Sequence, residues 1–310
     1  MATGTGMQAH EHAHDTSDSG SATRPLAAHE LHEGYFTGAG GVRLYRCHVP
    51  ALVQRPGAPV LVLMHGYGDH CRRYDELARF LARRGIGVAS FDARGHGRSA
   101  GQRGYVRDFE DYVDDLCVFF DSVARSEPER SVALLGHSNG GLISLLAVAR
   151  GALSPRALVL SNPLVELHAR RRAVPDWTAQ LLSQLAPRLP LPSGIAPEDL
   201  THDPELILAR RADRYVHRLA TPRWYWSMQR ATRLAQAQAR QLNLPTLMIA
   251  SELDSLVEPR AVKLCFERMP ARDKRLLQRA GAFHEALHEV DRRALFATLA
   301  EWLEPRMEPV

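Results

Sequence analysis

A chain of 310 residues is long enough to bury a large core, and its hydrophobic content of 45% and charged content of 24% are ordinary for a globular protein. The formal net charge is +4, but the basic residues are spread along the chain among nearly as many acidic ones. We therefore expect no nucleic-acid partner, because binding a polyanion requires a concentrated basic patch.

The sequence carries no pattern typical of export, membrane insertion or metal binding. No apolar run approaches the ~18 residues of a membrane span, and the N-terminus lacks the basic and apolar regions of a signal peptide. We expect a cytoplasmic protein, with peripheral membrane contact and the oligomeric state left open. The cysteines have no metal-ligand spacing, so we expect free thiols: they are Cys47, Cys71, Cys117 and Cys265.

Residues 1–24 are rich in small and polar side chains and poor in large apolar ones. Such a composition buries too little apolar surface to offset the entropy of ordering, so we predict a disordered tail. His10, His12 and His14 alternate within it. We expect no metal site there, because nothing fixes a ligand geometry.

Short apolar runs alternate with helical patterns along most of the chain. The first two runs, 30–37 and 42–49, are joined by a Gly-rich turn that predicts a hairpin. The later runs are typical of strands buried on both faces of a parallel sheet: 60–64, 88–91, 131–135, 157–161, 246–250 and a weaker 275–277. Helical patterns occupy residues 73–84, 108–125, 142–150, 260–268 and 292–303. This alternation predicts an α/β fold with a doubly wound, mostly parallel sheet.

Residues 162–243 interrupt the alternation, because no clear sheet strand appears there. Pro-punctuated helical patterns instead occupy 176–185, 204–210 and 222–241. We predict a helical cap inserted into a core formed by residues 25–161 and 244–310. Its apolar residues either line an apolar pocket or form the core of the cap itself: Trp177, Leu181, Leu182, Leu185, Leu189 and Leu191.

The segment around Ser138 has the clearest chemical signature. A buried-strand pattern leads into Gly136-His137-Ser138-Asn139-Gly140, and a helical pattern follows. A strand, a Gly-x-Ser-x-Gly turn and a helix in that order form a nucleophile elbow, in which Gly136 and Gly140 leave room for a very tight turn. Ser138 is therefore the candidate nucleophile. The backbone N–H of Asn139, at the start of the helix, is a candidate oxyanion donor.

A second Gly-rich turn, His65-Gly66-Tyr67-Gly68, follows the predicted strand at 60–64. The oxyanion of an acyl-transfer reaction needs a second backbone donor from such a loop. We assign that donor to the N–H of Tyr67. His65 and Gly66 are interpreted as supporting residues, with the glycine allowing the backbone to turn its amides inward.

The candidate acid and base follow two later strands. Asp254 comes after the run at 246–250, and His284 comes after 275–277. Because the loops at the carboxyl ends of parallel strands converge on one edge of the sheet, we expect both near Ser138. A Ser hydroxyl needs a base to take its proton, which is the role of His284. Asp254 would fix the tautomer of that imidazole.

Four other polar residues near these loops are interpreted as noncatalytic. Glu252 lies too near the end of its strand to replace Asp254, and His288 falls a turn into the next helix, consistent with an ordinary surface residue. The loop at residues 92–99 is rich in glycine and hydrogen-bonding groups. We expect Asp92 and His96 to order this loop rather than to react.

Together, these motifs resemble the monoacylglycerol lipase and lysophospholipase family of the α/β-hydrolase superfamily. The resemblance covers residues 36–303 and rests on segments 65–74, 92–99, 136–141, 161–163 and the loops of Asp254 and His284. It implies an α/β-hydrolase fold, a cap over the site, hydrolysis of lipid-like monoacyl esters and no cofactor. Asn139 stands where the family commonly has Met, which changes the polarity of the pocket and leaves the backbone donor in place.

The sequence therefore predicts a serine carboxylester hydrolase that cleaves a monoacylglycerol or a lysophospholipid through an acyl-enzyme. The exact ester and the movement of the cap are left open. One alternative is a general short-chain carboxylesterase, and another is an acyltransferase or thioesterase with the same triad. A third is a noncatalytic ligand-binding protein that keeps the fold.

Overall fold

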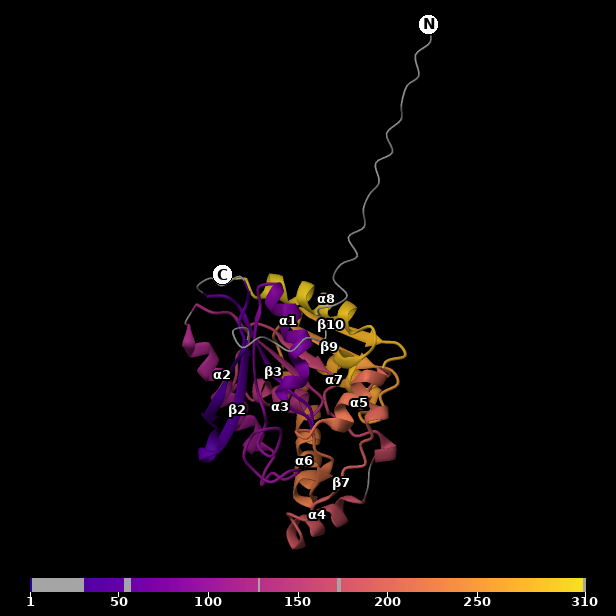
Figure 1. Cartoon of the computed structure of the whole chain (residues 1–310). Coiled ribbons are helices and arrows are strands. Elements are labelled where there is room, and N and C mark those ends of the chain that lie inside the picture. Colours follow the sequence, from indigo (N-terminus) through magenta and orange to yellow (C-terminus); the bar gives the residue numbers. More distant parts are fainter. Residues whose placement is uncertain (2–30, 53–56, 128, 172–173, 309–310) are drawn as a thin grey trace.

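The structure is a computed structural model that describes residues 1, 31–52, 57–127, 129–171 and 174–308. The predicted tail at residues 1–24 lies outside these ranges apart from Met1. One sheet of eight strands passes through the body of the protein, and helices lie on both of its faces (Figure 1).

The strand order is β1-β2-β4-β3-β5-β6-β9-β10. The strands are β1 (His32–Thr37), β2 (Arg43–Val49), β3 (Val60–Met64), β4 (Gly87–Phe91), β5 (Val132–His137), β6 (Leu158–Ser161), β9 (Thr246–Ser251) and β10 (Lys274–Arg279). β2 is antiparallel to both of its neighbours, and every other pair is parallel. The predicted hairpin and the mostly parallel sheet are both confirmed.

The register of the central strands determines which loops meet. Met64, the last residue of β3, lies opposite Gly136 of β5. The turn that begins at His65 therefore emerges beside the turn that contains Ser138. On the other side of β5, His137 lies opposite Ser161, the last residue of β6.

Helices cover the sheet in two layers that separate the alternate side chains of each strand. Leu61 and Leu63 of β3 pack with one group of helices, α1 (Asp75–Arg83) and α8 (Arg292–Leu303). Val62 and Met64 pack with the other group, which consists of α2 (Glu110–Ser126), α3 (Asn139–Ala149) and α7 (Pro259–Arg268). Short 3-10 helices are η1 (Ala39–Gly41), η2 (Cys71–Tyr74), η3 (Ala169–Arg171), η4 (Pro197–Asp199), η5 (Ala239–Gln241), η6 (Ala286–His288) and η7 (Glu304–Arg306).

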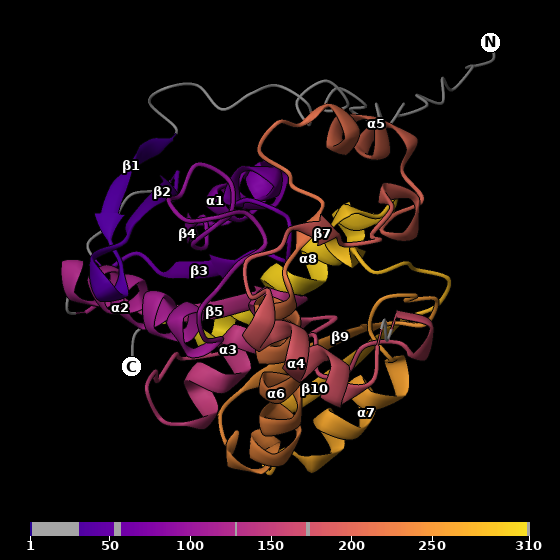
Figure 2. The ribbon, with the colours of Figure 1, turned by 90° about the horizontal axis from the view of Figure 1, so that it is seen from below.

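The segment at residues 162–243, which we call the cap segment, lies between β6 and β9. It contains α4 (Asp176–Leu185), α5 (Pro204–Ala212) and α6 (Pro222–Gln238), and α6 packs between α3 and α4. Figure 2 shows α4 in front of α6. Two short strands, β7 (Leu191–Pro192) and β8 (Leu219–Ala220), pair here, apart from the main sheet, which takes no strand from the described residues of this segment.

Most of the apolar residues that the sequence analysis named in the cap segment are exposed to solvent. α4 turns its small residues Ala179 and Ser183 inward, where both are buried. The long side chains on its other face point outward, because small residues allow α4 to pack closely against α6. Five of the six named residues are exposed and form neither a cap core nor an enclosed pocket: Trp177, Leu181, Leu185, Leu189 and Leu191.

Candidate active site

Ser138 lies on a strained turn between β5 and α3. Its φ of 53° and ψ of −118° place it in a region that side chains rarely adopt. The neighbouring backbone holds it there: Ser138 N–H donates to Ser161 O at 2.9 Å, and its carbonyl accepts from Leu142 and Leu164. The turn raises the hydroxyl at the end of the strand, beside the first turn of α3.

Two glycines make this turn sterically feasible. A Cβ on Gly140 would clash with the carbonyl oxygens of Met64 and His65, in the adjacent strand and loop. A Cβ on Gly136 would clash with Gly140 O and with the hydroxyl of Ser144. The sequence spacing is therefore set by backbone contacts, as the elbow interpretation predicted.

The structure brings together the three residues that the sequence proposed as a triad. Ser138 Oγ lies 2.8 Å from His284 Nε2, and Asp254 Oδ2 lies 2.6 Å from His284 Nδ1. All three residues are buried. With the Nδ1 proton donated to the carboxylate, Nε2 is the free acceptor that faces the Ser hydroxyl. The arrangement is able to take a proton from Ser138 and to stabilise the resulting imidazolium.

The other oxygen of Asp254 is fixed by its own loop. Asp254 Oδ1 accepts the N–H groups of Leu256 at 2.8 Å and Val257 at 2.9 Å. The carboxylate thus has one oxygen bound to the backbone and one aimed at His284. Glu252, the rival acid, is not in this position; its N–H donates to Arg279 O at the edge of the sheet.

Asn162 is a site residue that the sequence analysis did not single out. It is buried with a φ of 43° and follows β6. Its Oδ1 accepts from Ser251 N at 2.7 Å, and its Nδ2 donates to His284 O at 2.5 Å. The amide therefore joins the ends of β6 and β9 to the loop of the catalytic histidine candidate. The Ser161-Asn162-Pro163 motif in the resemblance was the available signal.

The two predicted oxyanion donors come from the start of α3 and from the turn after β3. Asn139 is the first residue of α3, where amide groups have no acceptor within the helix. Tyr67 lies in the turn after β3, and the neighbouring Gly66 packs closely against Ser138 and His137. His65 orders this turn, because its Nδ1 contacts Gly66 O at 2.7 Å and its Nε2 accepts from Ala93 N at 3.0 Å.

The amino-acid sequence is similar to those of several known proteins. A family model described as serine aminopeptidase, S33, matches residues 56–291. The monoacylglycerol lipase of Mycolicibacterium smegmatis is 32% identical over 276 residues, which cover 87% of this chain and 96% of that protein. Phospholipase YtpA of Bacillus subtilis is 28% identical over 245 residues, 78% of this chain and 93% of that protein.

The solved structure of Paleococcus ferrophilus monoacylglycerol lipase has a TM-score of 0.76 and 26% identity, and it covers 85% of this chain and 99% of its own. The chain belongs to the S33 hydrolase family. The α/β-hydrolase fold, the resemblance to monoacylglycerol lipases and the prediction of a hydrolytic enzyme are confirmed. The matched residues of this hydrolase include Ser138, Asp254 and His284.

A cluster of buried charged side chains surrounds Glu285, the residue that follows His284 in this hydrolase. Arg73 donates to both oxygens of Glu285, at 3.1 and 2.9 Å, and to Asp69 at 3.2 Å. Arg210 of α5 donates to Glu285 Oε1 at 3.0 Å. Burial opposes the ionisation of Glu285, but the charges of Arg73 and Arg210 outweigh it and hold the pKa of this carboxyl well below its usual range. The cluster ties α5 to the loop that carries the histidine.

The interpretation of His288 as a surface residue is wrong. It lies at the end of η6 and is 5% exposed. Its Nε2 lies 3.0 Å from Arg73 O, and its Nδ1 lies 3.2 Å from Glu285 Oε2. The helical pattern begins later, at Arg292, so His288 falls in the folded loop that packs against the charge cluster.

His137, beside the nucleophile, is held neutral. Its ring centroid is 5.0 Å from that of His284, and its Nδ1 lies 3.1 Å from Ser161 O. Burial, followed by the charge of His284, lowers the pKa of His137 to about 3. His137 therefore carries no charge beside His284 at neutral pH.

Asp92 and His96 have the ordering contacts that the sequence analysis expected. The carboxylate of Asp92 accepts from Cys71 N and Arg98 N, each at 2.8 Å. The His96 ring is fully buried against Tyr67, with 5.3 Å between centroids. These contacts fix the loop at residues 92–99 against the turn at residues 65–68, which we call the oxyanion turn after its predicted role.

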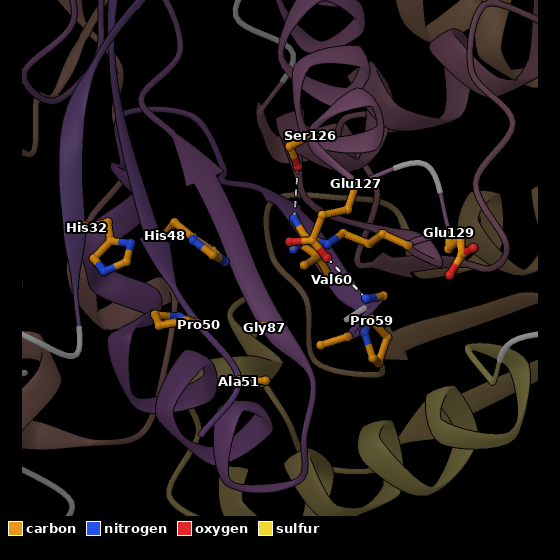
Figure 3. A pocket seen from close by; sticks show the side chains of 13 residues that line it. His32, His48, Pro50, Ala51, Pro59, Val60, Gly87, Ser126, Glu127 and Glu129 are labelled. Atoms are coloured by element: carbon orange, nitrogen blue, oxygen red, sulfur yellow. Dashed lines mark hydrogen bonds and ion pairs between the residues drawn. The ribbon is translucent and has the colours of Figure 1, made fainter. Parts of the chain in front are cut away.

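A separate hollow of about 810 Å³ lies at the opposite end of the sheet (Figure 3). It is lined by Pro59 and Val60 at the start of β3 and by Gly87 at the start of β4. The side chains of the triad lie beyond the carboxyl ends of the strands. This hollow is therefore not part of the site around Ser138.

Proposed function

We propose that this hydrolase cleaves the ester bond of a monoacyl lipid, such as a monoacylglycerol or a lysophospholipid. The observation that carries the proposal is the hydrogen-bonded series Ser138, His284 and Asp254. The relative from M. smegmatis is named a monoacylglycerol lipase and the one from B. subtilis a phospholipase, which supports a lipid ester as substrate.

In the proposed mechanism, His284 takes the proton of Ser138 as Oγ attacks the ester carbonyl. The N–H groups of Tyr67 and Asn139 hold the oxyanion of the tetrahedral intermediate. His284 then gives its proton to the leaving alcohol, and an acyl-enzyme on Ser138 remains. His284 then takes a proton from a water molecule that attacks the acyl carbon, and returns this proton to Ser138 Oγ as the fatty acid leaves.

We further propose that residues 162–243 act as the cap that selects the acyl chain, over a core of residues 25–161 and 244–310. Two contacts support a close fit between this segment and the oxyanion turn. Trp224 of α6 stacks on Tyr67 with 3.7 Å between ring centroids. The Tyr67 hydroxyl donates to Leu219 O in β8 at 2.7 Å.

A substrate series on one purified preparation tests the proposed substrate. Monoacylglycerols, lysophospholipids and p-nitrophenyl esters of matched chain lengths would be compared by kcat/KM. The proposal expects a long monoacyl lipid to exceed the short p-nitrophenyl esters, because a longer acyl chain buries more apolar surface. A preference for the shortest esters would support a general carboxylesterase instead.

The same triad serves acyl transfer if an alcohol or thiol replaces water. Product analysis with added alcohols separates the two reactions, since transfer gives a new ester and hydrolysis gives only the free acid. The proposal expects the free acid as the main product. A dominant new ester at modest alcohol concentration would identify an acyltransferase.

We also propose that the outward face of α4 contacts membranes peripherally. Within the described ranges, no helix is long and apolar enough to cross a membrane. Trp177, Leu181 and Leu185 are spaced four residues apart on that face, and Trp177 is 68% exposed. Figure 1 shows α4 at the end of the molecule farthest from α8. Arg188 and Arg218, nearby in the cap segment, are exposed and suit anionic lipids.

Vesicle binding tests this surface with a matched control. Leu185→Glu is expected to lower the affinity for phosphatidylglycerol vesicles, measured by co-sedimentation, by about tenfold. Hydrolysis of a soluble short ester should be unchanged. Val290→Glu, at a residue of similar exposure, 67%, outside the cap segment, is the control and should bind as the parent does. Equal binding by both variants would show that α4 is not the contact.

A further inference from the structure

The fold brings together two cysteines that appear scattered in the sequence. Cys47 lies in β2, and Cys71 is the first residue of η2. Their Sγ atoms are 3.3 Å apart in the interior, although 24 residues separate them in the chain. With Tyr45, they form a small buried cluster of their own, and both are free thiols.

The backbone on both sides is already fixed in place. Cys47 lies opposite Glu33 on one neighbouring strand and Ser90 on the other. Cys71 donates its N–H to Asp92 Oδ1 at 2.8 Å. A disulfide holds its sulfurs ~2 Å apart, so the pair needs to close by only about 1.3 Å, which is within the range of side-chain rotation.

We propose that Cys47 and Cys71 are an oxidation site and form a reversible disulfide when the protein meets a peroxide. Cys47 is the more exposed residue of the two, 6% against 2%, so we assign the first reaction with the small oxidant to its thiol. Its thiolate attacks one oxygen of hydrogen peroxide, which gives a sulfenic acid and releases hydroxide. The sulfur of Cys71 then displaces the sulfenic hydroxyl and loses its proton. Together the two thiols lose two electrons and two protons, and the peroxide becomes two water molecules.

The proposed order of events agrees with the surroundings of Cys71. Burial raises the pKa of its thiol, and the hydrogen bond with Cys47 and the charge of Asp92 raise it further. Cys71 is therefore poorly suited to attack a peroxide in solution. It is well placed to resolve a sulfenic acid that forms 3.3 Å away.

The disulfide would close a loop that contains β3 and the oxyanion turn. It would link the end of that turn to β2 without a contact to Ser138, Asp254 or His284. A loop of this length restricts the unfolded chain, so the oxidised protein is expected to unfold about 5–10 °C higher than the reduced one. The inference does not depend on the proposed substrate.

Thiol counting and peptide mass test the proposal on the unaltered chain. The protein is treated with hydrogen peroxide, freed of it, denatured and titrated, and four thiols should fall to two. Trypsin does not cut between Arg55 and Pro56, so both cysteines fall in the peptide of residues 47–72. The mass of this peptide should fall by two hydrogen atoms and return with dithiothreitol.

Variants assign the linkage. Cys117→Ser, which removes the half-buried thiol of α2, should still lose two thiols and gain the thermal shift. Cys47→Ser and Cys71→Ser should show neither change. Retention of four thiols by the unaltered chain would overturn the proposal, and so would a linked or oxidised Cys117 or Cys265 with peptide 47–72 unchanged. The first measurement does not require any variant to fold.

Discussion

His284 Nε2 lies 2.8 Å from Ser138 Oγ, although 146 residues separate them in the chain. Ser138 follows β5, and His284 follows β10 at the edge of the sheet, with β6 and β9 between these strands. The contact forms because the loops at the carboxyl ends of parallel strands project from the same edge. A folded sheet is therefore a precondition for the proposed chemistry.

Replacement of Asp254 by Asn should separate chemistry from folding. The amide keeps an oxygen for the N–H groups of Leu256 and Val257, but it no longer fixes the tautomer of His284. We expect kcat to fall by about 10³- to 10⁴-fold with little change in the unfolding midpoint. Glu252→Gln, at the rival acid, should keep kcat within about twofold. The reverse ranking of the two variants would move the acid to Glu252.

Loss of the Asn162 side chain should weaken both stability and turnover. Asn162→Ala leaves the buried Ser251 N–H and His284 carbonyl without this partner. We expect the free energy of unfolding to fall by about 2–4 kcal/mol and kcat by roughly tenfold through misplacement of His284. Urea unfolding and short-ester kinetics measure the two effects. Asn243→Ala, at an exposed position, is the control, and an equal loss there would remove the special role of Asn162.

The elbow should not tolerate a methyl group at Gly140. Gly140→Ala would place Cβ against the carbonyl oxygens of Met64 and His65, which belong to rigid backbone. We expect more than about 3 kcal/mol of destabilisation, or failure to fold. Gly34→Ala is the matched control, because its Cβ would find only Arg46 Nε, at 3.9 Å. An unchanged midpoint for Gly140→Ala would contradict the elbow geometry.

Local sequence patterns predicted those candidate site residues whose positions are set by the backbone of the sheet and its loops. Ser138, Asp254 and His284 each follow a strand, and the topology of a parallel sheet then places such loops together. The roles of Gly136 and Gly140 in the elbow could also be predicted, because close backbone contacts exclude every larger residue there. The same reasoning gave the mostly parallel sheet and most helices to within a few residues.

The features that sequence analysis missed depend on pairing between distant side chains. Nothing around Arg210 indicates that it reaches Glu285, and nothing around Cys47 indicates that it meets Cys71. The exposure of the outward face of α4 was not predicted, because an apolar side chain is more often buried than exposed. The structure shows that the small residues, such as Ala179, make the packed face instead.

Acidification should destabilise the protein before its carboxylates titrate. Burial lowers the pKa of His137 to about 3 and those of His48 and His217 to about 4. The unfolded chain takes up these protons below pH ~6.5, whereas the folded chain does not. The free energy of unfolding should therefore fall as the pH drops from 6.5 to 4, by up to about 1.4 kcal/mol per pH unit for each histidine. Urea midpoints at pH 7, 6 and 5 measure the slope, and a flat or rising series would contradict it.

Labelling with a fluorophosphonate tests the proposed nucleophile most directly, because this probe phosphonylates a serine only where a base and an oxyanion site activate it. The account predicts one adduct per chain, located on Ser138 by peptide mass, and none on a folded Ser138→Ala variant. That variant should also lose about 10⁴- to 10⁶-fold of the ester hydrolysis. An unlabelled folded protein, an adduct on another serine, or a Ser138→Ala variant that keeps its activity would contradict the account.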